Sequence, residues 1–141
     1  MLTSTVVTRG LFAYQLLLEL DVPVTDKNMI AVVAWMLGEN TQAKYNPLAT
    51  EHQVSGSTQF NSAGVQNFRT LSDGLQATVY TLSGTLYRRR IYKKILDALT
   101  VGNSVHITSA AIENSPWGTQ NVPWEPVAAD PLKYSMIPVA Q

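Results

Sequence analysis

The feature that most constrains the fold of this chain is a polar stretch, residues 39–71, that separates two regions with helical periodicity. It is rich in Asn, Ser, Thr, Gly and Gln, and Asn46-Pro47 is a turn signal within it. Long segments of this kind in small domains usually carry function or contain short strands. We therefore expect a small hairpin formed by residues 58–60 and 65–68, within a lobe of loop and sheet.

Two helices are predicted before this stretch. Residues 9–20 have a wide apolar face, which indicates deep burial, and Pro23 keeps the helix from continuing. Residues 26–37 form the second helix, with Thr25 as its N-cap and Gly38 at its C-terminal end.

Helical periodicity resumes after the polar stretch. It predicts a helix with Ser72 as N-cap, running through Leu82, and a second helix over residues 87–99. A short last helix begins at Ser104 or Thr108. The expected fold class is therefore mainly α, of an α+β kind, with a sheet-and-loop lobe between the second and third helices that forms a cleft.

The C-terminal part of the chain has a different character. From Trp117 onward it contains four of the seven prolines and little periodicity, which predicts an extended arm. Its apolar side chains cannot form a core by themselves, so we expect them to cover a partner or a second copy of the chain. The expected division is one domain over residues 1–119 and an arm over residues 120–141.

Composition excludes several classes of function. Lys plus Arg is 10 and Asp plus Glu is 10, so the zero net charge argues against a nucleic-acid partner. There is no cysteine, and the two histidines are far apart in sequence, so we expect neither a thiol nor a His-based metal site, although a carboxylate site stays open. No apolar run approaches the roughly 20 residues of a membrane span. A charged fraction of only 14% favours an assembly component or a protein that handles an uncharged polar ligand such as sugar.

Glu39 is the first candidate for chemistry. It directly follows Gly38, and Trp35 lies one helical turn earlier, so the two side chains can share a face. The negative end of the helix dipole and exclusion of water by an indole would both raise the pKa of the carboxyl, as a general acid requires. The competing interpretation, a solvated Glu after a helix, is favoured by position alone.

Three further segments contain side chains suited to a polar ligand. Amides and hydroxyls bind sugar hydroxyls, and a tryptophan on a loop forms either a cleft wall or a lid on the core. Each segment also has a plain structural interpretation, as a turn, a hairpin or a lid. The candidate residues are Asn46 and Thr50 in the first segment, Gly64, Val65, Gln66 and Phe68 in the second, and Trp117 in the third. A basic run, Arg88–Arg90 with Lys93 and Lys94, is interpreted as a solvated helix face.

In order and spacing these segments resemble a known family, the lysozyme-like peptidoglycan-hydrolase domains of bacteriophages, especially those of actinobacteria. These domains are distantly similar to goose-type lysozymes and lytic transglycosylases. The resemblance covers about residues 10–119 and is carried mainly by Ala34-Trp35, Glu39, Asn46-Pro47-Leu48-Ala49-Thr50, Asn61-Ser62-Ala63-Gly64-Val65-Gln66-Asn67-Phe68, Asp73-Gly74-Leu75-Gln76-Ala77-Thr78 and Ser115-Pro116-Trp117-Gly118-Thr119.

The resemblance implies that Glu39 is the catalytic acid and that the other candidates line a glycan groove. The substrate would be the bond between N-acetylmuramic acid and N-acetylglucosamine, broken with capture by water or by the 6-hydroxyl of muramic acid, without metal or cofactor. It also implies a phage virion or tail protein that acts on the host cell wall, with the arm contacting other virion proteins.

Two alternatives to the enzyme stay open at this stage. One is a catalytically inactive structural virion or tail protein that keeps the lysozyme-like fold, and the other is a glycan-binding module without turnover. The enzyme predicts Glu39 at the floor of an open cleft that faces residues 64–68. The structural protein predicts a cleft blocked by residues 120–141.

Overall fold

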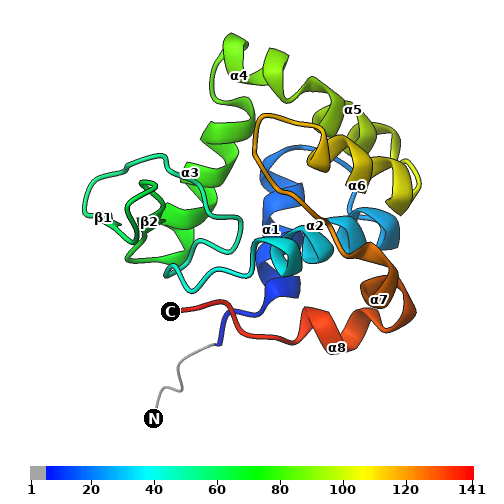
Figure 1. Cartoon of the computed structure of the whole chain (residues 1–141), viewed down its shortest axis with the longest axis horizontal. Coiled ribbons are helices and arrows are strands. Elements are labelled where there is room, and N and C mark those ends of the chain that lie inside the picture. Colours follow the sequence, from blue (N-terminus) through cyan, green and yellow to red (C-terminus); the bar gives the residue numbers. More distant parts are fainter. Residues whose placement is uncertain (1–5) are drawn as a thin grey trace.

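The computed structural model describes residues 6–141, and within them the chain is mainly helical with one small antiparallel sheet (Figure 1). The expected mainly α class with a small sheet is confirmed. The elements in chain order are α1 (Arg9–Glu19), α2 (Asp26–Glu39), β1 (Thr58–Gln59), β2 (Gln66–Asn67), α3 (Leu71–Ser83), α4 (Leu86–Ile91), α5 (Lys93–Val101), α6 (Val105–Glu113), α7 (Trp124–Ala129) and α8 (Pro131–Ser135).

Helix α2 begins as predicted and ends later. The Thr25 hydroxyl accepts a hydrogen bond from the Asn28 N–H at 3.2 Å, which confirms Thr25 as the N-cap. The helix does not stop at Leu37 but continues to Glu39, and Asn40 follows in the left-handed conformation with φ of 44°. Asn40 therefore provides the C-terminal cap that the sequence analysis assigned to a glycine.

Gly38 lies inside the last turn of α2 for a different reason. A Cβ at this position would lie 2.1 Å from the carbonyl oxygen of Asn121, so only glycine allows the backbone around residue 121 to pack on the helix. The consequence for the site is that Glu39 belongs to α2 and takes its position from it.

The polar stretch contains the expected hairpin, in a shorter form. Strands β1 and β2 are antiparallel, with Thr58 opposite Asn67 and Gln59 opposite Gln66. Figure 1 shows the two strands of this lobe beside α3. The rest of residues 40–70 is irregular, so its shape depends on side-chain hydrogen bonds more than on strand pairing.

Two predicted boundaries after the lobe need correction, and one is confirmed. The N-cap of α3 is Thr70 and not Ser72, because the chain turns into the helix two residues earlier. The helix expected over residues 87–99 is broken at Tyr92, where φ is −104° and ψ is 15°, into α4 and α5. Ser104 is confirmed as the N-cap of α6.

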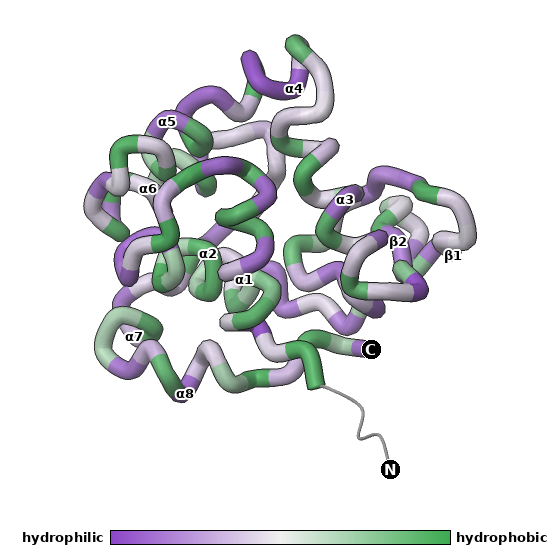
Figure 2. Tube along the Cα trace, turned by 180° about the vertical axis from the view of Figure 1, so that it is seen from behind, coloured by the Kyte–Doolittle hydropathy of each residue, from purple (hydrophilic) through white to green (hydrophobic). Residues whose placement is uncertain are grey.

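The segment expected to be an extended arm, residues 120–141, is neither extended nor separate. It forms α7 and α8, which pack against α2 and α1, and its final residues run beside the start of α1 (Figures 1 and 2). The Val139 N–H donates to the Val7 carbonyl at 2.8 Å, and Thr8 and Pro138 form an isolated bridge. The division of the chain at residue 119 therefore does not describe two structural parts.

The prolines of residues 120–141 predicted an extended arm, but two of them lie in the first turn of a helix. Pro131 is the first residue of α8, and Pro126 lies in the first turn of α7. Both are positions where a missing N–H costs no helical hydrogen bond. A proline-rich segment with such spacing therefore remains compatible with short helices.

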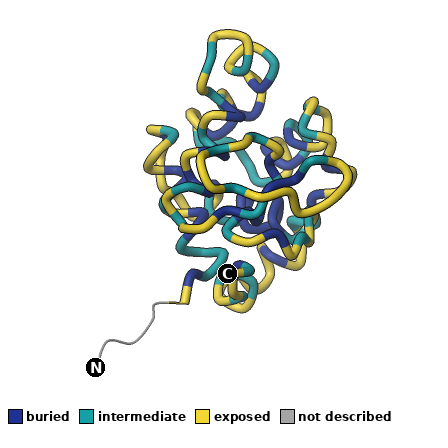
Figure 3. Tube along the Cα trace, turned by 90° about the vertical axis from the view of Figure 1, so that its left-hand side faces the viewer, coloured by how far each residue is buried: buried dark blue, intermediate teal, exposed yellow. Residues whose placement is uncertain are grey.

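Helix α2 occupies the centre of the core, between α1, α6 and α7. Figure 3 shows buried chain at the centre of the molecule and mainly exposed chain at the top, where α4 lies. Within residues 6–141 each helix is too short or too polar to cross a membrane. The largest fully buried side chains include Phe12, Leu16, Leu17, Trp35, Met36, Leu82, Ile95, Leu99 and Ile112.

Candidate functional site

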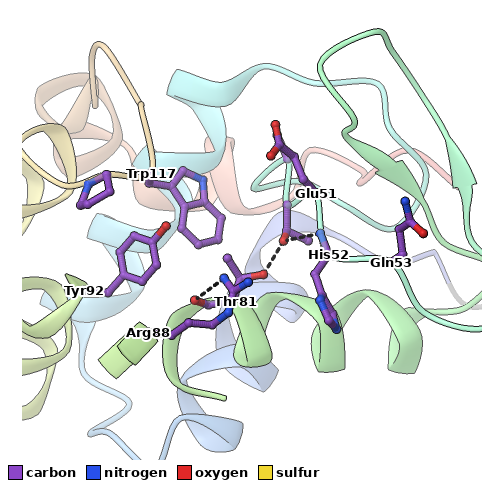
Figure 4. Close-up of a pocket in the computed structure, with 10 residues that line it drawn as sticks. Glu51, His52, Gln53, Thr81, Arg88, Tyr92 and Trp117 are labelled. Carbon is purple, nitrogen blue, oxygen red and sulfur yellow. Dashed lines mark hydrogen bonds between the residues drawn. The ribbon is translucent and has the colours of Figure 1, made fainter. Parts of the chain in front are cut away.

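A cleft of about 640 Å³ lies between the polar lobe, α3, the α4–α5 break and the loop that follows α6 (Figure 4). Its volume falls within the usual range for sites that bind small molecules or parts of a polymer. Aromatic, hydroxyl, amide and charged side chains all contribute to its walls. The lining residues are Ala49, Thr50, Glu51, His52, Gln53, Thr81, Arg88, Tyr92, Pro116 and Trp117.

Trp117 forms a fixed aromatic wall of this cleft. Its indole N–H donates to the Leu48 carbonyl at 2.8 Å. Its ring packs edge-to-face against Trp35 at 4.9 Å and against Tyr92 at 5.6 Å between centroids. A tryptophan held on two sides in this way offers a rigid apolar surface to a ligand.

A chain of hydrogen bonds joins Glu39 to this wall. The indole N–H of Trp35 donates to the Thr119 hydroxyl at 3.0 Å, and that hydroxyl donates to Oε1 of Glu39 at 2.6 Å. Trp35 and Thr119 are buried, whereas Glu39 is half-buried at the end of α2. Thr119 therefore holds one carboxyl oxygen of Glu39 in place and is itself held by Trp35, which packs on Trp117.

Burial raises the pKa of Glu39 above its ordinary value, while the hydrogen bonding from Thr119 and the Trp35 indole opposes the rise. The net direction is upward, as expected from the sequence. Glu39 is not one of the residues that line the cleft, so its expected place at the cleft floor is incorrect. It lies behind the wall, connected to Trp117 through Trp35 and Thr119.

Asn46 was expected to contact substrate, and the structure corrects this interpretation. Its side chain has no exposed surface, and its Nδ2 donates to the carbonyls of Thr50 at 2.9 Å and Gln66 at 2.8 Å. Its Oδ1 accepts from the Thr50 N–H at 2.9 Å. The amide nitrogen and the amide oxygen of Asn46 are therefore both bonded to backbone groups of the lobe, so Asn46 fixes the shape of the lobe from inside.

We expect Asn46→Ala to destabilise the protein by about 2–4 kcal/mol, because three buried hydrogen bonds from its side chain to the backbone would be lost. The measurement is the free energy of unfolding in urea, with the exposed Asn114→Ala as the matched amide control, for which little change is expected. A stability equal to that of the wild type would contradict the structural role of Asn46.

The segment 64–68 also lies mostly inside the lobe. Val65, Gln66 and Phe68 are 8%, 3% and 2% exposed, and none of them lines the cleft. The Gln66 amide is used internally, since Oε1 accepts from the Ser57 hydroxyl at 2.9 Å and Nε2 donates to the Gly64 carbonyl at 2.9 Å. These three residues shape the lobe, and their expected role in binding is corrected accordingly.

Gly64 and Thr50 are placed differently from the rest of their segments. Gly64 has a φ of 93°, and the nearest atom to a Cβ built there would be Cγ of Glu51 at 4.0 Å, so glycine serves the turn and leaves open space beside Glu51. Thr50 lines the cleft although it is nearly buried, and its hydroxyl is hydrogen-bonded to that of Thr81. Trp35 supports the wall from behind without reaching the cleft.

The sequence analysis missed much of the cleft lining. Arg88 was assigned to a solvated helix face, and Tyr92 to a continuous helix, because no Gly or Pro marks the break that turns them toward the lobe. His52 stacks on Tyr80 at 4.1 Å between ring centroids, a pairing of residues far apart in sequence. Of the lining residues, the sequence analysis had named Thr50 and Trp117 as candidates for binding.

No cluster of three or more metal-ligating His, Asp or Glu side chains occurs within residues 6–141. Comparisons of the chain with protein-family models, with curated proteins and with solved structures give no match. The functional argument therefore depends on the geometry of the cleft and of Glu39.

Proposed function

We propose that the protein is a glycosidase that cuts the glycan strand of peptidoglycan, as a muramidase or a lytic transglycosylase, with Glu39 as its acid. The observation that carries the proposal is the half-buried Glu39 carboxyl, whose pKa is raised by burial and whose Oε1 is held by Thr119 behind the aromatic wall of a polar cleft. A raised pKa keeps a carboxyl protonated to higher pH, and a protonated carboxyl can donate its proton to a glycosidic oxygen.

The remaining chemistry needs few groups from the protein. Proton donation from Glu39 breaks the bond to the leaving sugar, and an oxocarbenium-like centre develops on the muramic acid. Water or the 6-hydroxyl of the same sugar then captures that centre, and the ionised Glu39 takes up the proton released. The flat Trp117 ring suits a sugar face. Thr119 donates to Oε1 of Glu39, so we assign the transferable proton to Oε2.

For Glu39 to act, the glycan must pass along the Trp117 wall to the open end of α2. Glu39 does not line the cleft in the free protein, and catalytic contacts often form fully only when substrate binds.

We further propose that the protein acts from a bacteriophage virion, as part of the tail, on an actinobacterial cell wall, with no nucleic-acid or membrane partner. This part of the proposal is supported by the sequence resemblance. Contact with other virion proteins would use the exposed apolar side chains of residues 120–141, chiefly Leu132 and Met136, which are 69% and 63% exposed.

The alternative is a structural virion or tail protein that has lost catalysis but kept a lysozyme-like fold. That alternative predicts a cleft filled by residues 120–141, whereas all the lining residues come from 49–53, 81–92 and 116–117. The unobstructed cleft therefore favours an enzyme or a glycan-binding module over the structural protein.

The test is the loss of turbidity of purified actinobacterial cell wall on addition of the wild-type protein. We expect clearing, and mass spectrometry of the soluble fragments then separates reducing muramic ends from 1,6-anhydro ends. Absence of clearing by a folded, monodisperse protein would refute the enzyme. Sedimentation of the protein with the insoluble wall would then separate the binding module from the structural protein.

A further inference from the structure

The end of the cleft formed by Arg88 has properties that proton donation by Glu39 does not explain. Arg88 comes from the first turns of α4, whose N-cap is Thr85. Its Nη1 donates to the Thr81 carbonyl at 3.3 Å, and its guanidinium lies 5.2 Å from the centroid of the Tyr80 ring. These two contacts hold the charged group in the cleft wall, where it is half-buried.

No carboxylate neutralises this guanidinium within the part of the chain that the structure describes. The ion pair found there joins Lys93 to Asp97 on the outer face of α5. The cleft carboxylate, Glu51, lies at the opposite edge of the lining residues from Arg88 in Figure 4. A guanidinium has five N–H donors, so Arg88 keeps most of its hydrogen-bonding capacity for a ligand.

The charge of Arg88 also acts on its neighbours in the cleft. It contributes, after burial, to lowering the pKa of His52, and it opposes the rise that burial causes in the pKa of Tyr92. His52 is therefore mainly neutral near pH 7, and Arg88 is the fixed positive charge among the lining residues. The cleft thus has a positive end at Arg88 and a negative end at Glu51.

We propose that Arg88 binds a carboxylate on the substituent that muramic acid carries at its 3-position, so that the cleft selects acidic peptidoglycan strands over uncharged polymers of N-acetylglucosamine. This inference rests on the proposed function. Arginine pairs with carboxylates through two parallel hydrogen bonds, which gives direction as well as affinity. The sugar ring would lie on Trp117, with its acidic substituent toward α4 and its hydroxyls toward Glu51.

Two groups on peptidoglycan share this chemistry. One is the lactyl carboxylate of muramic acid without a peptide, and the other is a carboxylate of the stem peptide attached there. The probes are therefore chitotetraose, a peptide-free tetrasaccharide of alternating N-acetylglucosamine and N-acetylmuramic acid, the same tetrasaccharide with stem peptides, and the free stem peptide. Binding is measured by calorimetry in a Glu39→Gln background, so that turnover does not disturb the titration.

The expected result is a preference for at least one acidic tetrasaccharide over chitotetraose that depends on Arg88. Arg88→Gln should weaken binding of that tetrasaccharide about tenfold or more and leave chitotetraose unchanged. Arg88→Lys should give an intermediate loss, because it keeps the charge without the two-pronged geometry. Arg89→Gln is the matched control, since Arg89 is the next residue of α4, is exposed and does not line the cleft. The acidic probe that shows the Arg88 effect identifies the carboxylate.

Three results would overturn the inference. Equal weakening for chitotetraose and the acidic probes would show that Arg88 only supports the fold, and Arg88→Lys together with thermal unfolding curves would expose such a defect. Equal effects of Arg88→Gln and Arg89→Gln would indicate general electrostatic attraction. Absence of any preference, including absence of binding, would exclude a carboxylate site. An Arg88-dependent preference for an acidic tetrasaccharide without wall clearing would refute the proposed glycosidase and leave this inference standing. Wall clearing without such a preference would refute this inference and leave the glycosidase standing.

Discussion

Glu39→Gln is expected to lower the rate of cell-wall clearing by about 10²- to 10⁴-fold, the usual contribution of a general acid. The amide has almost the same shape as the carboxylic acid, and its oxygen can still accept the hydrogen bond from Thr119. What it loses is the transferable proton. The measurement is the initial rate of turbidity loss, with circular dichroism as the check that the variant is folded.

Glu19→Gln is the matched control for this experiment. Glu19 ends α1 as Glu39 ends α2, so both substitutions remove a carboxyl from the last residue of a helix, but Glu19 is exposed and distant from the cleft lining. Clearing by Glu19→Gln should equal that of the wild type. Undiminished clearing by Glu39→Gln would assign the proton to another group, and Glu51→Gln would be the next variant to measure.

The raised pKa of Glu39 also fixes the sign of the pH dependence. The acid must be protonated to act, so clearing should be retained below the folded-state pKa of Glu39 and be lost as the pH rises through it. The same shift affects folding, because a carboxyl whose pKa is raised in the folded state stabilises the fold only while it is protonated. Its contribution is present below the unfolded pKa and is lost as the pH rises through the folded pKa.

Glu39→Gln should therefore be at least as stable as the wild type at neutral pH, although it is inactive. The difference between the melting temperatures of the two proteins should widen in favour of the variant as the pH rises from acid to neutral. A variant less stable than the wild type at neutral pH would indicate that the ionised carboxylate stabilises the fold, contrary to the direction set by burial.

Local features of the sequence were sufficient to predict the parts of the fold that depend on near neighbours. Thr25 and Ser104 cap their helices through N–H groups three residues ahead, so short spacing identifies them. Trp35 and Glu39 could be placed together because they are one turn apart on a helix. The link between them, Thr119, comes from the other end of the chain, and its hydrogen bonds appear only in the folded molecule.

The cleft was harder to predict because its residues meet through long-range contacts. Asn46 has the composition of a sugar-binding residue, but its partner, the Gln66 carbonyl, lies 20 positions away and takes the side chain into the interior. Arg88 is of a type usually found on the surface, yet its contacts with the Thr81 carbonyl and the Tyr80 ring hold it in the cleft wall. Residue type indicated a polar, aromatic site, whereas the choice of residues depended on tertiary structure.

Removal of residues 120–141 is expected to leave a chain that is largely unfolded. The segment buries Val122, Val127 and Val139 at 3% exposure or less. Full burial of one such side chain contributes roughly 1.5–3 kcal/mol, whereas a domain of this size is stable by only about 5–15 kcal/mol. The measurement is the far-ultraviolet circular dichroism of the truncated chain and its thermal transition, which should be weak or absent.

The control separates folding from partner contact. Replacing Leu132 and Met136 together by Ser changes only exposed side chains of the same segment, so the melting temperature should stay close to that of the wild type. The truncation should also abolish clearing, because it removes the backbone around Asn121 that packs on Gly38 and makes Thr119, which holds Glu39, the last residue of the chain. A truncated chain that folds, melts and clears like the wild type would show that residues 1–119 form an independent domain. The buried valines of residues 120–141 would then not be needed for folding.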